Sequence, residues 1–278
     1  MKTLIAVLAL AIMLSPSIIQ AEEHQDPGVA TNQPPSQWGY SLSELIQSEY
    51  YGTIFGGIFY AGPMSWTDLV ASHHDKYGSL TFDLSIGQKL DRLDRYNGDG
   101  GNEYDFTIDH TLNIDIGSYQ VKADAGVCYL ALYDLRDASN DAFEEFCRLD
   151  FPIGTNHCGG AFIQPYAEVF HYHEVGYGFH NKGWWTYGGA FRNQPLGITV
   201  FGNELNLNID FRIGASAGAY SSKTGIEYYR LAFALPIVKG NWMVSPSIIF
   251  QIPGGSGRTF VHNDESNVFY TLFIKRSF

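Results

Sequence analysis

Three groups of side chains have residue types and spacings that suggest chemistry. His73, His74 and Asp75 are consecutive, but no serine-centred nucleophile motif accompanies them, so they are expected to lie in a turn. His171 and His173 are two residues apart, which places both rings on one face of a β-strand. Two imidazoles in that arrangement have the spacing to chelate a metal ion.

The metal interpretation is the weaker one for the histidine pair. Ile163, Ala167 and Val169 share its strand face and indicate that this face contacts lipid, so we expect histidines at a membrane rim near lipid headgroups. A glycine-rich segment carries oxygen ligands of the kind that bind calcium: Asp94, Asn97, Asp99, Asn102 and Glu103. Their spacing differs from that of an EF-hand loop, so a solvated acidic loop is expected. The sequence therefore predicts no metal site and no cofactor.

The elements that position these groups are β-strands, and the clearest are residues 102–116 and 118–133. In both segments polar and apolar residues alternate, with Gly117 as the turn between them. Only a strand with one polar and one apolar face places every second residue on the same side. Strands of about 15 residues exceed the usual globular length of about 5 to 6, whereas a tilted membrane-spanning strand needs about 9 to 11 within the bilayer. The two segments predict a hairpin of a transmembrane barrel.

Residues 1–21 have the features of a secretory signal peptide. Lys2 precedes an apolar run from Leu4 to Leu14, and Ala21 stands before the acidic Glu22. The apolar run is too short for a transmembrane helix, and no second run of about 20 apolar residues follows. An exported chain without such a helix can reside in a membrane only as a closed barrel.

Residues 22–50 are predicted to form a periplasmic leader, and residues 51–278 the barrel. Residues 22–37 are polar and contain three prolines. Ser41 and Glu44 match a capping box, and three apolar residues would share one face of a short helix ending near Tyr50: Leu42, Leu45 and Ile46. Such a helix would plug the barrel or lie beneath it. A disordered leader running straight into the first strand is the alternative.

Alternation and turn residues predict about twelve strands beyond residue 50. They are expected at 51–60, 66–74, 79–89, 102–116, 118–133, 143–151, 161–173, 183–192, 199–217, 225–237, 241–252 and 267–278. Long glycine-rich connections follow the third, fifth, seventh, ninth and eleventh of them, which is typical of outer loops, and tight connections follow the fourth and tenth. Two connections, 152–160 and 193–198, are longer than this pattern predicts. The fold class is therefore all-β, a transmembrane antiparallel up-and-down β-barrel.

Composition narrows the partners and the scaffold. Three cysteines are too few for a disulfide framework, and a formal net charge of −12 argues against a nucleic-acid partner. Counting back from the intervening loop places Cys128 almost opposite Cys147, but alternation points the first inward and the second outward. Because their Cβ vectors diverge, no disulfide between them is expected.

The last strand resembles the assembly signal of Gram-negative outer-membrane proteins. Tyr270, Leu272 and Ile274 alternate towards a terminal Phe278, although Arg276 takes a position where the family has an apolar or aromatic residue, and the usual internal glycine is missing. In length and strand number the chain also loosely resembles the twelve-stranded nucleoside-channel and TorF-type porin families. The resemblance implies a location in the cell outer membrane, with outer-membrane lipid, lipopolysaccharide and the barrel-assembly machinery as partners.

Inward-facing charges are predicted to form two walls of the barrel lumen. The acidic wall consists of Asp83, Glu103, Asp105, Asp109, Asp115 and Asp124, and the basic wall of Arg212, Arg230 and Lys275. The two walls are expected to face each other across the lumen and to orient dipolar solutes. The alternative is that the charges pair directly and fill a narrow interior.

A passive, porin-like channel for small polar solutes is the function that this lumen favours. About twelve strands lie between the filled eight-stranded barrels and the water-filled porins of 16 or more strands. One alternative is a structural or adhesive barrel that does not conduct. Another is an outer-membrane enzyme that modifies lipids, but the sequence shows no clustered nucleophile, base and orienting group, so no enzymatic activity is expected.

Overall fold

The structure is a computed structural model. It describes residues 36–48, 50–51, 58–60, 63–75, 78–90, 103–116, 119–132, 141–151, 162–174, 183–217, 224–254 and 267–278. The predicted signal peptide, most of the predicted leader, the acidic loop before Glu103 and the connection 152–160 lie outside these residues. Within the described ranges, no helix is both long and apolar enough to cross a membrane.

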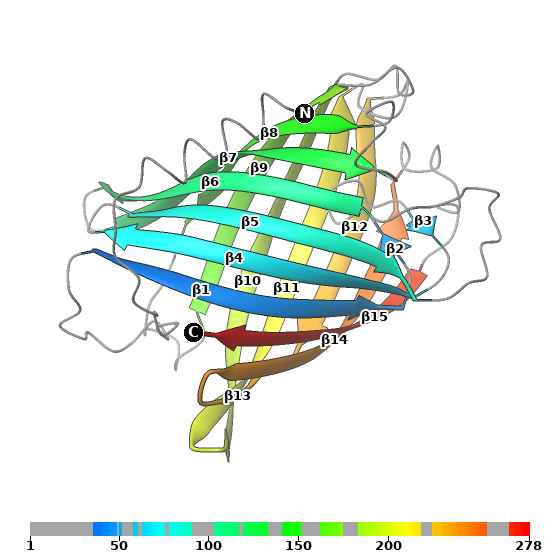
Figure 1. Ribbon diagram of the computed structural model, residues 1–278. Helices are drawn as coiled ribbons and strands as arrows, with labels where there is room; N and C mark the ends of the chain where they lie inside the picture. Colours follow the sequence, from blue (N-terminus) through cyan, green and yellow to red (C-terminus); the bar gives the residue numbers. More distant parts are fainter. Residues whose placement is uncertain are drawn as a thin grey trace.

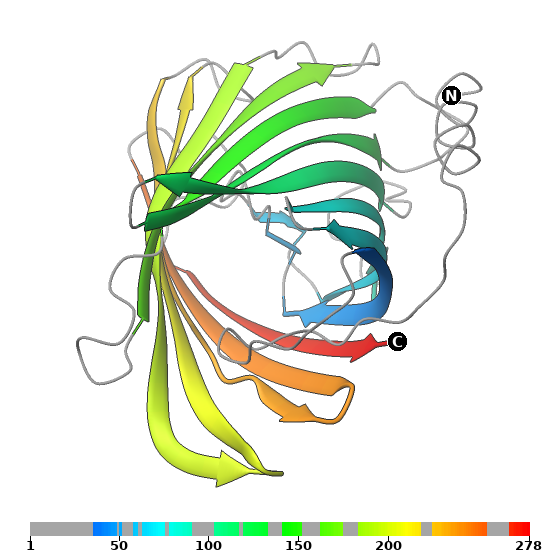
Figure 2. The same ribbon diagram turned by 90° about the vertical axis from the view of Figure 1, so that its left-hand side faces the viewer.

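Twelve of the described strands form one closed antiparallel barrel (Figure 1). They are β1 (Ser36–Gln47), β4 (Met64–Asp75), β5 (Gly78–Lys89), β6 (Glu103–Ile116), β7 (Tyr119–Leu132), β8 (Ala142–Asp150), β9 (Phe162–Glu174), β10 (Gly183–Val200), β11 (Asn203–Ala217), β12 (Gly225–Ala234), β14 (Trp242–Pro253) and β15 (Asn267–Ser277). Pairing of β1 with β15 and of β12 with β14 closes the ring, which curls round on itself in Figure 2. The predicted fold class is confirmed.

Three short strands lie outside this ring. β13 (Ile237–Lys239) pairs with the start of β14 and so extends the hairpin that β12 forms with β14. β2 (Tyr50–Tyr51) and β3 (Ile58–Tyr60) pair only with each other, between β1 and β4 in the chain. The predicted first strand at 51–60 is therefore not a strand of the barrel.

The barrel begins at residue 36 rather than 51, because Ser36–Gln47 is a strand. β1 pairs along its whole length with β4 and over residues 41–47 with β15. The predicted helix from Ser41 is wrong, since Leu42 and Ile46 are exposed on one face and Ser43 and Gln47 are buried on the other. Pairing on both sides satisfies two rows of backbone groups, which outweighs the two hydrogen bonds of a capping box.

Residues 193–198 continue β10 instead of connecting two strands. A register shift between Pro195 and Thr199 marks a bulge, which accommodates a proline that cannot donate to the ladder. The hairpin to β11 turns at Phe201 and Gly202, whose φ angles of 52° and 85° suit a two-residue turn of type I′. The connection is therefore as short as the barrel pattern requires.

The two rims of the barrel differ. β1 begins and β15 ends at the same rim, called here the terminal rim, where three connections are the two-residue segments 76–77, 117–118 and 201–202. The opposite rim, called here the loop rim, holds long connections such as 90–102 and 254–266, whereas 151–161 is a long connection at the terminal rim. His73, His74 and Asp75, predicted to lie in a turn, are the last residues of β4 at the terminal rim, and the His73 ring lies 5.1 Å from that of Trp38.

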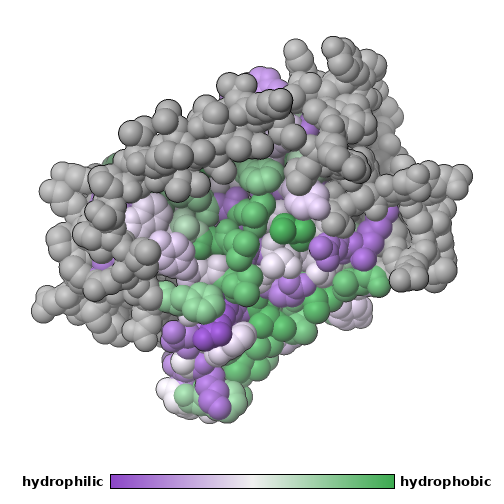
Figure 3. Space-filling model, viewed as in Figure 1, coloured by the Kyte–Doolittle hydropathy of each residue, from purple (hydrophilic) through white to green (hydrophobic). Residues whose placement is uncertain are grey.

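Side chains alternate between the outer and inner faces of the wall. Apolar residues such as Leu69, which is 49% exposed, gather on the outer face, and Figure 3 shows apolar side chains running together along the visible flank. Cys128 is buried and Cys147 exposed, and both are free thiols. Their partners across the strand pair are Glu144 and Ala125, so the two cysteines are not opposite each other as the sequence count suggested.

Candidate functional site: the barrel lumen

The predicted acidic residues lie on β5, β6 and β7. The register pairs Asp83 with Thr107, Asp105 with Ser85 and Asp109 with Gly126, all on the inner face. Glu103 begins β6, and Asp124 on β7 accepts a hydrogen bond from Thr111 at 3.3 Å. For Asp115 the structure gives the backbone position only, opposite Gln120. The members of the predicted wall therefore lie on three consecutive strands.

Two further carboxylates that the sequence analysis missed extend this wall. Asp68 on β4 accepts hydrogen bonds from Ser43 at 2.9 Å and Ser85 at 2.7 Å, and Glu144 on β8 is opposite Cys128. Asp68 shares one face of β4 with the apolar Trp66 and Val70, so alternation in the sequence did not mark it as a polar inward residue. Together with the predicted residues they form an inner surface of carboxylates from β4 to β8, called here the acidic wall.

Three side chains of the acidic wall have buried oxygens without a hydrogen-bond partner. These atoms are Asp83 Oδ1, Asp105 Oδ1 and Glu144 Oε1. None of the ion pairs between described residues involves these three side chains. Asp83 and Asp105 also lie within electrostatic range of each other and of Asp68. Burial of a carboxylate without a partner is unfavourable unless a proton or a cation neutralises it.

Two of the three predicted basic residues lie across the barrel from the acidic wall. Arg212 on β11 and Arg230 on β12 are direct partners in the strand register. The strand order puts β11 six strands from β5 and β12 six strands from β6, which is opposite in a ring of twelve. Lys275 differs, because ring closure leaves only β1 and β4 between β15 and β5, and Lys275 lies within electrostatic range of Asp83. The prediction that Lys275 stands across the lumen is wrong.

Both arginines are held by their own neighbours rather than by the acidic wall. Arg212 Nη2 lies 3.5 Å from Asp210 Oδ2, and its Nε donates to the Tyr166 hydroxyl at 3.1 Å. Arg230 donates to Gln251 Oε1 from Nε at 3.1 Å and from Nη2 at 2.8 Å. The guanidinium groups of Arg212 and Arg230 therefore have hydrogen-bond partners on nearby strands. Asp83, Asp105 and Glu144 of the acidic wall each keep one buried oxygen without a hydrogen-bond partner.

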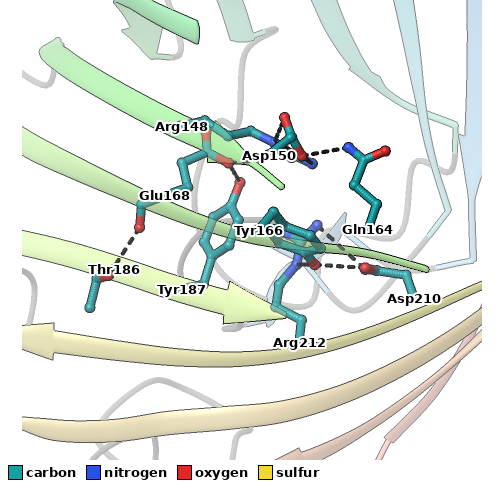
Figure 4. A network of polar contacts seen from close by, with 9 residues as sticks. All are labelled: Arg148, Asp150, Gln164, Tyr166, Glu168, Thr186, Tyr187, Asp210 and Arg212. Atoms are coloured by element: carbon teal, nitrogen blue, oxygen red, sulfur yellow. Dashed lines mark hydrogen bonds and ion pairs between the residues drawn. The ribbon is translucent and has the colours of Figure 1, made fainter. Parts of the chain in front are cut away.

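Polar contacts link the inner faces of the four consecutive strands β8, β9, β10 and β11 (Figure 4). Arg148 forms an ion pair with Asp150 at 2.8 Å and another with Glu168 at 3.5 Å, and the Tyr187 hydroxyl donates to Glu168. The Tyr166 ring lies near two guanidinium groups, with Cζ of Arg148 4.4 Å and Cζ of Arg212 5.8 Å from its centroid. We call this set the tyrosine–arginine network: Arg148, Asp150, Tyr166, Glu168, Tyr187, Asp210 and Arg212.

Apart from Arg212, the residues of this network were not predicted from the sequence. Arg148 and Asp150 stand two residues apart on β8, so alternation alone places both on one face. Their contact with Glu168 depends on the register between β8 and β9, which pairs Arg148 with Glu168. A connection of more than ten residues separates these two strands, so the register could not be counted from a turn.

Aromatic side chains fill the inner face beside the network. Phe170, Tyr172 and Trp185 are buried together with Tyr166 and Tyr187 in one cluster on β9 and β10. The inside of the barrel is therefore asymmetric, with bulky rings and fixed arginines on one side and carboxylates on the other.

The predicted assembly signal lies on the outer face of the closing strand. Tyr270 is 59% exposed, and Leu272 and Ile274 follow it on the same face. At the terminal rim the Arg276 guanidinium lies 5.3 Å from the Trp242 ring and 4.6 Å from the Phe278 ring, both measured from Cζ to the centroid. Such cation–π contacts at a rim explain how a charge is accommodated on the outer face of this strand.

No family model matches the sequence, and neither does any curated protein. Among solved structures, the chain is similar to a KdgM porin in complex with disordered oligogalacturonate, with 10% identity, 86% of this chain and 99% of that chain covered, and a TM-score of 0.47. It is also similar to an outer membrane channel from Pseudomonas putida F1, with 9% identity, 92% and 100% coverage, and a TM-score of 0.48.

Proposed function

We propose that this protein is a passive channel of the outer membrane that admits small polar solutes and favours cations. A closed barrel with an apolar outer face is the form in which strands cross a membrane. The predicted export signal and the predicted assembly signal of β15, which has Tyr270, Leu272 and Ile274 on its outer face, support the outer membrane of a Gram-negative bacterium as its location. Membrane lipid, lipopolysaccharide and the barrel-assembly machinery remain proposed partners.

The acidic wall is the observation that carries the channel proposal. Asp83, Asp105 and Glu144 expose no charge to lipid, yet they have no cationic partner among the described ion pairs. Mobile cations in a water-filled lumen would supply the missing compensation. A barrel filled only to stabilise itself would gain from pairing these groups or from replacing them by apolar residues.

The tyrosine–arginine network supports selection among the solutes. Arg212 of this network and the neighbouring Arg230 lie across the ring from the acidic wall, so a field in the lumen would run from these two arginines to the carboxylates. A transverse field of this kind orients dipolar or zwitterionic solutes during passage. We infer that a net-neutral polar solute passes more readily than an anion of the same size.

The second candidate is a structural barrel that does not conduct. It is favoured by the aromatic cluster and by the local ion pairs of Arg148, which fill part of the interior. A lipid-modifying enzyme is not favoured by the inner-face contacts described above, which join carboxylates, arginines, tyrosines and small hydroxyl groups.

Recording in a planar lipid bilayer tests the proposal. Purified protein, shown to be folded by its heat-modifiable mobility on a gel, is expected to insert with discrete conductance steps. Folded protein that adds no steps above the detergent control would support the structural barrel. Release of acyl chains from lipid in the same preparation would instead support the enzyme.

A further inference from the structure

We propose that the outer surface of the barrel carries a transition-metal site formed by Glu145, His171 and His173. The site is separate from the lumen and does not depend on conduction. Glu145 lies on β8 and both histidines lie on β9, where the register pairs Glu145 with His171 and Phe143 with His173. Glu145 shares its strand face with the exposed Cys147 and Leu149, so the group faces outward near the loop rim.

The spacing of the three side chains suits a single bound ion. Glu145 Oε2 lies 3.5 Å from His171 Nδ1 and 3.5 Å from His173 Nε2. One ligand atom from each of the three residues lies within 4.8 Å of the others. Two ligands held at about 2.0 to 2.1 Å from a tetrahedral zinc ion stand roughly 3.4 Å apart. The carboxylate therefore needs almost no movement to share an ion with either ring.

An unpartnered nitrogen points to a ligand at this position. His173 Nε2 is buried and makes no hydrogen bond, and Glu145 Oε2 lies 3.5 Å from it. A buried ring nitrogen without a partner is unfavourable, and a metal ion would satisfy it. The Glu145 side chain is 55% exposed and lies three residues from the loop-rim start of β8, so the carboxylate is the open side of the group.

Neighbouring rings hold the two imidazoles in place. The Trp184 ring on β10 stacks on His171, with centroids 4.2 Å apart and planes 17° from parallel. The His171 and His173 rings meet edge to face, with centroids 4.0 Å apart. A preorganised pair of imidazoles with one carboxylate matches the three-protein-ligand set of open zinc sites, and imidazole also suits copper and nickel.

This site was not predicted from the sequence, because the histidine pair has apolar neighbours on its own strand. The third ligand comes from the adjacent strand, across a connection that hides the register. Glu145 also interrupts the apolar face of β8, where a lone carboxylate facing lipid would be unfavourable. A bound cation removes that charge from the lipid-facing surface.

Zinc titration of the tag-free full-length mature chain, folded in detergent, tests the proposal. Calorimetry with zinc chloride in a non-chelating buffer is expected to show saturable binding of one ion per chain. His173→Ala and Glu145→Gln should each weaken binding at least tenfold. His110→Ala is the matched control, because His110 is an exposed histidine on the outer face of β6 outside the group, and it should bind zinc as the parent does.

A spectroscopic measurement distinguishes a built site from loose surface binding. Cobalt added to the parent protein is expected to give the visible absorption of a low-symmetry, four- or five-coordinate ion, and zinc should displace it. Heat-modifiable mobility establishes that each variant is folded. The proposal is overturned by a parent that shows no saturable binding, or by a folded His171→Ala/His173→Ala variant that binds zinc with the affinity of the parent.

Discussion

The guanidinium group of Arg212 on β11 lies over the ring of Tyr187 on β10, with Cζ 4.2 Å from the ring centroid. The hydroxyl of the same tyrosine donates to Glu168 on β9. One side chain thus connects a basic residue of one strand with an acidic residue two strands away. This connection fixes the arginine against the barrel wall and leaves the opposite acidic wall without it as a partner.

Tyr187→Phe is expected to lower the free energy of unfolding by about 1 to 3 kcal/mol, because Glu168 loses a buried hydrogen bond. Urea unfolding in lipid vesicles, followed by tryptophan fluorescence, measures the change. Tyr229→Phe is the control, since Tyr229 faces outward on β12, and it should change stability by less than about 0.5 kcal/mol. Equal effects of the two substitutions would contradict the role given to the Tyr187 hydroxyl.

Gly189→Ala is expected to destabilise the barrel by about 1 to 3 kcal/mol through overpacking. A Cβ atom at Gly189 would lie 2.2 Å from the Phe211 carbonyl oxygen and 2.7 Å from the Tyr166 hydroxyl. The adjacent Gly188 is a matched control, because a Cβ atom there finds its nearest neighbour, the Tyr166 carbonyl oxygen, at 3.7 Å. Thermal loss of the compact gel form should occur at a lower temperature for Gly189→Ala only, and coincident transitions would argue against this packing.

Removal of residues 22–50 is expected to prevent barrel formation. The deletion takes away β1, which pairs with both β4 and β15 and closes the ring. Removal of residues 22–35 alone spares every described strand and should leave a heat-modifiable barrel. A chain starting at residue 51 that still gives the compact gel form would show that β1 is dispensable.

Deletion of Phe278 is expected to reduce insertion into the outer membrane severalfold. Its backbone nitrogen donates to the Tyr40 carbonyl at 2.9 Å, and its ring packs under Arg276 at the end of the closing strand. Membrane fractionation and heat-modifiable mobility measure the loss. Asp99→Asn, a substitution between β5 and β6 in the chain, serves as the control. Normal insertion without Phe278 would remove the strongest family resemblance.

Strand faces were predictable where one face contacts lipid over many residues. On β5, β6 and β7 the alternation is unbroken, so the strand face of Asp83, Asp105 and Asp109 followed from periodicity alone. β1 was missed because Leu42, Leu45 and Ile46 share one face of a helix, whereas a strand places Leu45 opposite Leu42 and Ile46. Pairing with β4 and β15 is what makes this segment a strand.

Contacts between strands were less predictable than strand faces. Glu168 meets Arg148, and Glu145 meets His171, through the pairing of β8 with β9. A two-residue turn would fix such a register, but the connection between these strands is long. The prediction that Lys275 lies across the lumen was wrong for another reason. The last strand of a closed barrel lies beside the first, so β15 is close to β5.

The reversal potential in a salt gradient tests the account of the acidic wall most directly. At a pH at which the Asp105 and Asp109 carboxyl groups are ionised, the wild-type channel is expected to favour cations, and Asp105→Asn with Asp109→Asn should shift the reversal potential towards that of anions, because two charges leave the lumen. Glu145→Gln removes a carboxylate from the outer face and should leave the reversal potential unchanged. A wild type that passes no current, or a double variant that keeps the wild-type reversal potential, would contradict the proposed channel.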